Sequence, residues 1–263
     1  MALEIVQVDA FTAEPFVGNP AVVCFLPEAR QEAWMQKVAA EMNTSGTAFL
    51  VERAQGWDIR FFTPATEVKL SGHTTLSSAH VLWESGRLEL EEPARFFSAA
   101  GELTATRDGE WIELDFPALP EQRASAPPAL LEALGLMPVY VGRNAYDYLV
   151  VVDQEATVRD LRPDFPLLTQ VDTRGVMVTA QGESGEYDFV SRFFAPAAGL
   201  PEDPVTGSAH CCLGPYWAKR LGKEQMLARQ LSARGGAIRV RPEGERVVLA
   251  GQAVTVLRGE LLG

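Results

Sequence analysis

The chain is poor in cysteine and histidine, with three of each among 263 residues. Cys211 and Cys212 are adjacent, so a framework of disulfide bonds is not indicated. Three histidines without a cluster of carboxylates or cysteines make no metal-binding pattern, so no metal is expected. No Gly-x-Gly-x-x-Gly or P-loop pattern occurs either, which leaves nucleotide binding without support.

Positive charge is also scarce, because 23 lysines and arginines face 35 acidic residues and the net charge is −12. This balance argues against nucleic acids and anionic membrane surfaces as partners. No apolar run approaches the length of a membrane span. The first residues lack the basic and then apolar pattern of a secretory signal. We therefore expect a cytoplasmic protein that acts on a small molecule.

Apolar residues make up 47% of the chain and charged residues 22%, which is typical of globular proteins with a substantial core. A length of 263 residues allows one large domain or two of ordinary size. Apolar spacing predicts helices over 31–42, 72–83 and about 205–221, among many short strands. The proline-rich segment 118–128 is the predicted linker.

Two patches of the sequence repeat. Arg60-Phe61-Phe62-Thr63-Pro64-Ala65 resembles Arg192-Phe193-Phe194-Ala195-Pro196-Ala197, and Ser78-Ala79-His80 recurs as Ser208-Ala209-His210. Aligning the second pair of segments puts His73 opposite Asp203. We interpret the chain as two copies of one α+β domain, 1–117 and 118–263, each a curled mixed sheet around one apolar helix. The last strand is a candidate to cross to the first half, and chance similarity is the alternative.

The second repeat leads into a helix entrance, Asp203-Pro204-Val205-Thr206-Gly207-Ser208. Aspartate caps free N–H groups and proline tolerates the first helical position. Thr206, Gly207 and Ser208 offer N–H groups and hydroxyls where the helix dipole favours negative charge. The pattern therefore predicts an acid beside an anion-binding helix end, and both helix ends are expected at a shared cleft.

These residues, with others, resemble the PhzF-like family of phenazine biosynthesis isomerases. The matching stretches run through nearly the whole chain: Val8-Asp9-Ala10-Phe11, Gly18-Asn19-Pro20, Glu41-Met42-Asn43, Phe62-Thr63-Pro64, Gly72-His73, Glu202-Asp203-Pro204 and Thr206-Gly207-Ser208. The resemblance implies the diaminopimelate epimerase fold, a homodimer, no metal or organic cofactor, and a carboxylate-bearing substrate. The name-giving member moves a proton to shift a double bond in trans-2,3-dihydro-3-hydroxyanthranilate.

The resemblance also implies the roles of particular residues. Asp203 and His73 match groups that contact substrate, and the expected substrate-binding residues are Asn19, Gly72, Thr206, Gly207 and Ser208. One position departs from the family, because Gly46 stands where its isomerases usually carry the glutamate that moves the proton. Glycine cannot transfer a proton. We expect His73, whose intrinsic pKa is near neutral, to be a substitute acid/base.

Each of these residues also has a structural explanation: Asp203 as a helix cap, His73 as a buried histidine, and the glycine and serine as helix packing. His80 and His210 are expected in the core or at a domain contact, and both thiols of Cys211 and Cys212 are expected to be buried. Glu67 and Glu202 are expected to be solvated loop acids, with the cleft as the alternative.

Two functions follow from the sequence. The first is a PhzF-like isomerase in which Asp203 and His73 share the acid/base work. The second is a silent small-molecule binding or regulatory protein that keeps the cleft, which Gly46 favours. A different proton transfer, such as epimerisation or dehydration with a single base, is a related third possibility.

Overall fold

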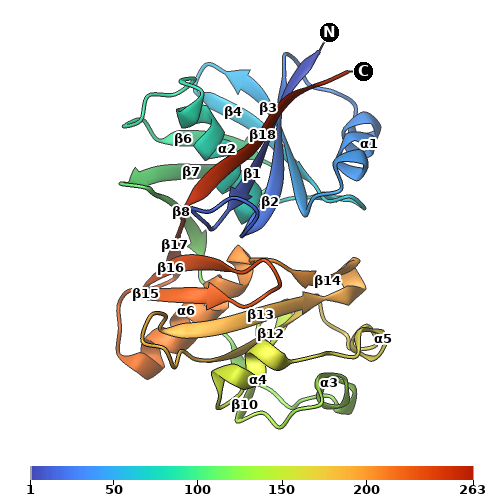
Figure 1. The fold of residues 1–263 in the computed structure, drawn as a ribbon, viewed down its shortest axis with the longest axis vertical. Helices are drawn as coiled ribbons and strands as arrows, with labels where there is room; N and C mark the ends of the chain where they lie inside the picture. Colours follow the sequence, from blue (N-terminus) through green and yellow to red (C-terminus); the bar gives the residue numbers. More distant parts are fainter. Residues whose placement is uncertain (1, 263) are drawn as a thin grey trace. The chain divides into compact units, whose positions relative to one another are not determined.

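The computed structural model describes residues 2–262, which divide into two compact units. The first unit runs to Asp115 and takes up the chain again at Ala250, and the second unit is Phe116–Leu249. Both ends of the described chain lie in the first unit, where Figure 1 shows the first and last strands side by side. No helix among the described residues is long and apolar enough to cross a membrane.

The first unit is a mixed sheet with two helices. Its elements are β1 (Leu3–Ala10), β2 (Asn19–Leu26), α1 (Glu32–Met42), β3 (Gly46–Arg53), β4 (Gly56–Phe62), β5 (Glu67–Val68), α2 (Gly72–Glu84), β6 (Ala94–Ser98), β7 (Gly101–Asp108), β8 (Trp111–Pro117) and β18 (Ala253–Leu261). β1 pairs antiparallel with β18 and β2, β2 pairs parallel with β3, and β4 pairs antiparallel with β3 and β5 and parallel with β6. β6, β7 and β8 then continue antiparallel.

Helix α2 is the apolar helix against which this sheet packs. Its residues 74–79 and 81–83 are buried, and it contacts β1, β2, β3, β7 and β18. The buried threonines and serines of α2 donate their hydroxyls to backbone carbonyls three or four residues earlier, so the helix can be buried on nearly every side. Helix α1 is amphipathic instead, with Met35, Val38 and Ala39 buried against a cluster that contains Phe49 and Phe62.

The second unit repeats this plan. Its elements are β9 (Gln122–Arg123), α3 (Pro128–Leu134), β10 (Tyr140–Arg143), β11 (Asp147–Val151), α4 (Glu155–Asp160), α5 (Phe165–Leu168), β12 (Gly175–Gln181), β13 (Phe189–Ala195), a 3₁₀ turn (Pro196–Ala198), β14 (Leu200–Asp203), α6 (Gly207–Leu221), β15 (Met226–Gln230), β16 (Gly236–Glu243) and β17 (Arg246–Gly251). β11 pairs parallel with β12, and β13 pairs antiparallel with β12 and β14 and parallel with β15.

The order of pairing in β2–β3–β4–β5–β6 therefore recurs in β11–β12–β13–β14–β15. The predicted α+β fold of two similar halves is confirmed, and the three predicted helices are present as α1, α2 and α6. Helix α6 begins at Gly207, two residues later than predicted. The predicted linker 118–128 contains β9, which pairs with β10, so this segment is part of the second unit's sheet.

The strand register corrects one sequence alignment. Phe61 pairs with Val68, and the equivalent Phe193 pairs with Asp203. Val68, and not His73, is therefore the counterpart of Asp203. The Ser-Ala-His alignment is wrong because Ser208 is the second residue of α6, whereas Ser78 lies in the middle of α2.

Candidate functional site

One candidate site, on the first unit, lies where β2, β3 and α2 begin. Because β2 and β3 are parallel, their starts lie at one edge of the sheet, which brings Asn19 and Ser45 together. The Ser45 hydroxyl donates to the Asn19 side-chain oxygen and lies 2.9 Å from the Pro20 carbonyl oxygen. It is also 3.4 Å from Nε2 of His73. Ser45 therefore links the two strand starts to the helix entrance.

His73 is the second residue of α2, after Gly72, and its Nδ1 lies 3.3 Å from the Ser71 hydroxyl. Burial lowers the pKa of His73 from 6.5 to about 4, because the imidazolium loses hydration. The near-neutral intrinsic pKa on which the sequence-based expectation rests is therefore not the pKa of this side chain in the folded protein. At pH 7 the ring is therefore neutral. One ring nitrogen carries a hydrogen, and the other has a lone pair that can accept a proton.

Gly46 opens β3, and no side chain fits there without a shift. A Cβ on residue 46 would stand 2.8 Å from His73 Nε2 and 2.5 Å from Thr74 Cγ2. Both separations are shorter than real Cβ contacts. In this chain the imidazole and a threonine methyl therefore occupy the space beside residue 46, and a glutamate there would have to displace them.

A second candidate site, on the second unit, lies at the end of β14 and the start of α6. Asp203 closes β14, and its Oδ2 accepts a 2.7 Å hydrogen bond from the Thr206 hydroxyl. Thr206 is the N-cap residue of α6, and its side chain makes no capping bond. Gln230 holds the turn together, accepting from the Thr206 N–H at 2.9 Å and donating to the Asp203 carbonyl at 2.7 Å.

Arg174 brings a positive charge to the same place. Its Nη2 lies 3.3 Å from the Ser208 hydroxyl, and its Nε donates to Asp147 Oδ1 at 2.8 Å. Asp147 is fully buried and binds the guanidinium through both carboxylate oxygens. Burial by itself lowers the pKa of Arg174, but the hydrogen bonds and charge of Asp147 raise it overall, and Asp203 adds to the rise. Arg174 is therefore a fixed cation at the α6 entrance.

Sequence analysis missed Arg174, Asp147 and Gln230. A signal was present in the sequence. Asp147 is the first residue of the apolar strand β11, and Arg174 directly precedes the apolar strand β12. These strands are parallel, and Asp147 pairs with Gly175. Parallel strands that start together bring the residues at their starts to one edge.

The two candidate sites are equivalent within the repeat. Thr47 pairs with Phe62 as Val176 pairs with Phe194, so Gly175 is the counterpart of Gly46. The residue before each glycine then reaches the second residue of the following apolar helix: Ser45 contacts His73, and Arg174 contacts Ser208. The same backbone plan thus presents two neutral side chains in the first unit, and a cation beside a hydroxyl in the second.

The two other histidines contact neighbouring groups of the fold, and the adjacent cysteines are buried. His210 is fully buried, with Nδ1 at 2.8 Å from the Thr206 carbonyl, and His80 lies 3.2 Å from the Thr255 hydroxyl. Cys211 and Cys212 are buried as expected, and burial raises the pKa of Cys212 to about 12, so it remains a thiol. No cluster of three or more His, Cys, Asp or Glu that could hold a metal ion occurs among residues 2–262.

Glu67 and Glu202 are not solvated loop acids, so that expectation is wrong. Glu67 lies on β5 and binds Arg60 at 2.7 and 2.6 Å. Glu202 lies on β14 and binds Arg192 at 2.7 and 2.9 Å. Each carboxylate faces the arginine of the neighbouring strand because the antiparallel register places the two side chains together.

The fold is an α+β fold that also occurs in epimerases. A hydroxyproline epimerase of Agrobacterium vitis has the same fold, with a TM-score of 0.65 at 12% identity over 99% of this chain and 92% of that chain. At this identity the likeness shows the fold alone.

The family is narrower. The family model described as phenazine biosynthesis-like protein matches residues 8–259. A protein of Halalkalibacterium halodurans named an uncharacterized isomerase is 55% identical over 100% of this chain and 99% of its own length. The crystal structure of a PhzF-family phenazine biosynthesis protein from Enterococcus faecalis matches with a TM-score of 0.95, at 40% identity over 100% of both chains. The chain belongs to the PhzF-like phenazine biosynthesis family.

Proposed function

We propose that this protein is an isomerase that moves a proton on a small carboxylate substrate without a cofactor. The α6 entrance carries the proposal, because it combines a helix N-terminus, the Ser208 hydroxyl and the Arg174 cation beside Asp203. A helix N-terminus and a guanidinium both favour a bound carboxylate. The isomerase name of a relative that is 55% identical supports the same class of reaction.

Each residue has a distinct part in the proposed reaction. The N–H groups of Gly207 and Ser208 and the guanidinium of Arg174 hold the substrate carboxylate. Asp203, kept in place by Thr206, takes a proton from carbon or returns it. The proposal keeps the sequence-based expectation that a second proton step falls to His73, at the entrance of α2.

At pH 7 His73 is in the protonation state of an acceptor, although its low pKa makes it a weak base. A ring with a pKa of about 4 is unprotonated at pH 7, so it can receive a proton, and the imidazolium that forms gives the proton up readily. Its neighbours Ser45 and Ser71 are hydroxyls at 3.4 and 3.3 Å, which can relay a proton or orient the ring. Asn19 and Gly72 complete the entrance as proposed substrate contacts.

A silent binding protein is the second candidate, and the packing at Gly46 favours it. The glutamate that moves the proton in the family's isomerases is missing, and His73 and Thr74 occupy the space beside this position. Under this candidate the α6 entrance still binds a carboxylate, but no proton moves. A homodimer and a cytoplasmic location stay predictions from the sequence under either candidate.

Incubation with trans-2,3-dihydro-3-hydroxyanthranilate in D₂O tests the proposal, with product and deuterium incorporation followed by NMR. The proposal expects turnover with deuterium at carbon, and a loss of about 10²–10⁴-fold in Asp203→Asn and His73→Asn. The exposed Asp172→Asn is the matched control, since it removes a carboxylate from the same unit as Asp203.

Binding without turnover would favour the second candidate. The Gly46→Glu variant then shows whether the missing acid is the reason that no proton moves. Turnover in that variant alone would mean that the site is intact and that this chain lacks its acid. Turnover in neither protein, with no binding, would refute the proposal for this substrate. Because Gly46→Glu must displace His73, the variant is compared with Gly46→Ala, which causes the same collision without adding an acid.

A further inference from the structure

The repeat gives each unit one arginine–glutamate pair on equivalent strands. Arg60 of β4 binds Glu67 of β5, and Arg192 of β13 binds Glu202 of β14, each through two hydrogen bonds of 2.6–2.9 Å. Each guanidinium also lies over the phenyl ring two residues further on, at 5.3 and 4.9 Å. The two pairs are therefore the same local structure formed twice.

The two arginines differ in their exposure to solvent and in their further hydrogen-bond partners. Nη1 of Arg192 donates to the carbonyl oxygen of Leu161 at 2.7 Å, with those of Val158 and Arg159 at 3.3 and 3.4 Å, and the side chain is 9% exposed. Arg60 is 38% exposed; its Nη2 also binds Glu32 Oε2 at 3.2 Å, and its Nη1 has no protein hydrogen-bond partner within residues 2–262. The chain segment that supplies acceptors to Arg192 thus has no counterpart over Arg60.

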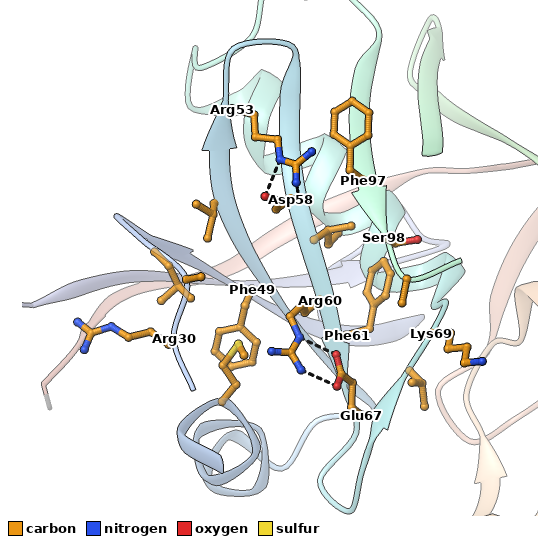
Figure 2. Close-up of a pocket in the computed structure, with 17 residues that line it drawn as sticks. Arg30, Phe49, Arg53, Asp58, Arg60, Phe61, Glu67, Lys69, Phe97 and Ser98 are labelled. Carbon is orange, nitrogen blue, oxygen red and sulfur yellow. Dashed lines mark hydrogen bonds and ion pairs between the residues drawn. The ribbon is translucent and has the colours of Figure 1, made fainter. Parts of the chain in front are cut away.

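A cavity of about 560 Å³ opens beside Arg60, on the first unit alone. Its apolar lining includes Leu26, Met35, Phe49, Ile59, Phe61 and Phe97, and its charged lining is Arg30, Arg53, Arg60, Lys69, Asp58 and Glu67. Figure 2 shows the Arg60 guanidinium close to Phe49, with two of its nitrogens joined to Glu67 by dashed lines.

The charge and volume of this cavity indicate the chemistry of a ligand. Four cationic residues face two acids in the lining, and Glu32, which binds Arg60 from α1, reduces the local balance to one positive charge, in a chain whose net charge is −12. Ligand cavities in proteins commonly measure about 300–1,000 Å³ and combine an apolar lining with a few polar groups. An N–H of a guanidinium left without an acceptor beside aromatic rings suits a carboxylate that has an apolar body.

We propose that this cavity is a second ligand site, which binds an apolar monocarboxylate. The carboxylate accepts a hydrogen bond from Nη1 of Arg60, as the carbonyl of Leu161 does from Arg192, and the apolar body packs on Phe49 and Phe61. The site lies apart from the residues that line the α6 entrance and is independent of the proposed isomerase function.

Titration with 1-naphthoate, followed by calorimetry on the full chain, tests this site. We expect binding with one molecule per cavity and binding at least about tenfold weaker for the uncharged 1-naphthalenemethanol, since charge-assisted hydrogen bonds are the stronger ones. Arg60→Gln should weaken naphthoate binding by about tenfold or more. Arg95→Gln, which removes an exposed arginine from the same unit outside the cavity, should leave it unchanged.

A second variant covers the case in which Arg60→Gln fails to fold. Ala29→Trp fills the cavity from an exposed loop position and should abolish binding, whereas Gln170→Trp, exposed in the second unit, should not. Ser208→Ala separates this site from the α6 entrance and should bind naphthoate at the cavity as before. The proposal is overturned if naphthoate does not bind, if Ala29→Trp binds it normally, or if Ser208→Ala alone abolishes binding.

Discussion

Nε2 of His73 lies 2.8 Å from the position that a Cβ on residue 46 would occupy, so the imidazole and a side chain at residue 46 exclude each other. The backbone of Gly46 does not adopt the left-handed conformation that favours glycine, so space and not φ restricts this position. The missing glutamate and the placement of His73 are therefore one structural feature, and changing either residue affects the other.

Gly46→Ala should destabilise the protein, because its Cβ would also stand 2.5 Å from Thr74 Cγ2. Overpacking of this kind costs about 1–3 kcal/mol of unfolding free energy, measured by urea denaturation. Gly207→Ala is the matched control, since its Cβ would meet only Leu249 Cδ1 at an ordinary 3.7 Å. We expect that variant to be neutral or more stable by up to about 1 kcal/mol. Equal stability of the two variants would contradict the collision.

Arg174→Met should leave the carboxylate of Asp147 buried and without its cation. Breaking a buried ion pair costs about 3–5 kcal/mol, and we expect about 3 kcal/mol because the Arg174 side chain is 41% exposed. Adding Asp147→Asn should recover part of this loss, because the buried group is then neutral. A double-mutant cycle on urea unfolding measures the coupling, and additive costs would show that the pair does not stabilise the second unit.

The two equivalent arginines should respond differently to lysine. Arg192→Lys should cost about 2–3 kcal/mol, because an ammonium cannot bind Glu202 through two parallel bonds and also reach the Leu161 carbonyl. Arg60→Lys should cost less than about 1 kcal/mol, since Arg60 is more exposed. Each variant is the control for the other in thermal and urea unfolding. An equal loss of unfolding free energy in both would contradict the proposed effect of the deeper burial of Arg192.

His210 should make the protein less stable in mild acid. Its Nδ1 faces the Thr206 carbonyl and must carry the proton, which leaves Nε2 as a buried acceptor without a partner among the described residues. Burial lowers the pKa of His210 from 6.5 to about 4, despite the opposing Thr206 bond. The unfolded chain then binds a proton that the native protein does not, so the contribution is complete above pH 6.5 and is lost as pH falls toward 4.

The expected size of this loss is on the order of 3 kcal/mol for His210, from about 1.4 kcal/mol per pKa unit. His210→Asn should be less stable at pH 7 and should show a flatter decline of unfolding free energy between pH 6.5 and 4. His73 contributes in the same direction, since burial also lowers its pKa. An unchanged pH slope in His210→Asn would show that His210 is not the titrating group.

Local pattern was enough for much of the fold. Apolar periodicity located α1, α2 and α6. The repeated Arg-Phe-Phe segments correctly indicated two similar halves. The short elements β5, β14, α4 and α5 were not predicted, because two to six residues carry too little periodicity.

The sequence by itself determined the family, the repeated α+β plan and the residues at the helix entrances, since all three depend on local patterns. Only the tertiary structure decided their partners. Strand register placed Val68 opposite Phe61 and Asp203 opposite Phe193, and parallel strands brought Asp147 to Arg174 across 27 residues. Burial then lowered the pKa of His73, an effect of the surrounding atoms that no property of the histidine itself reveals.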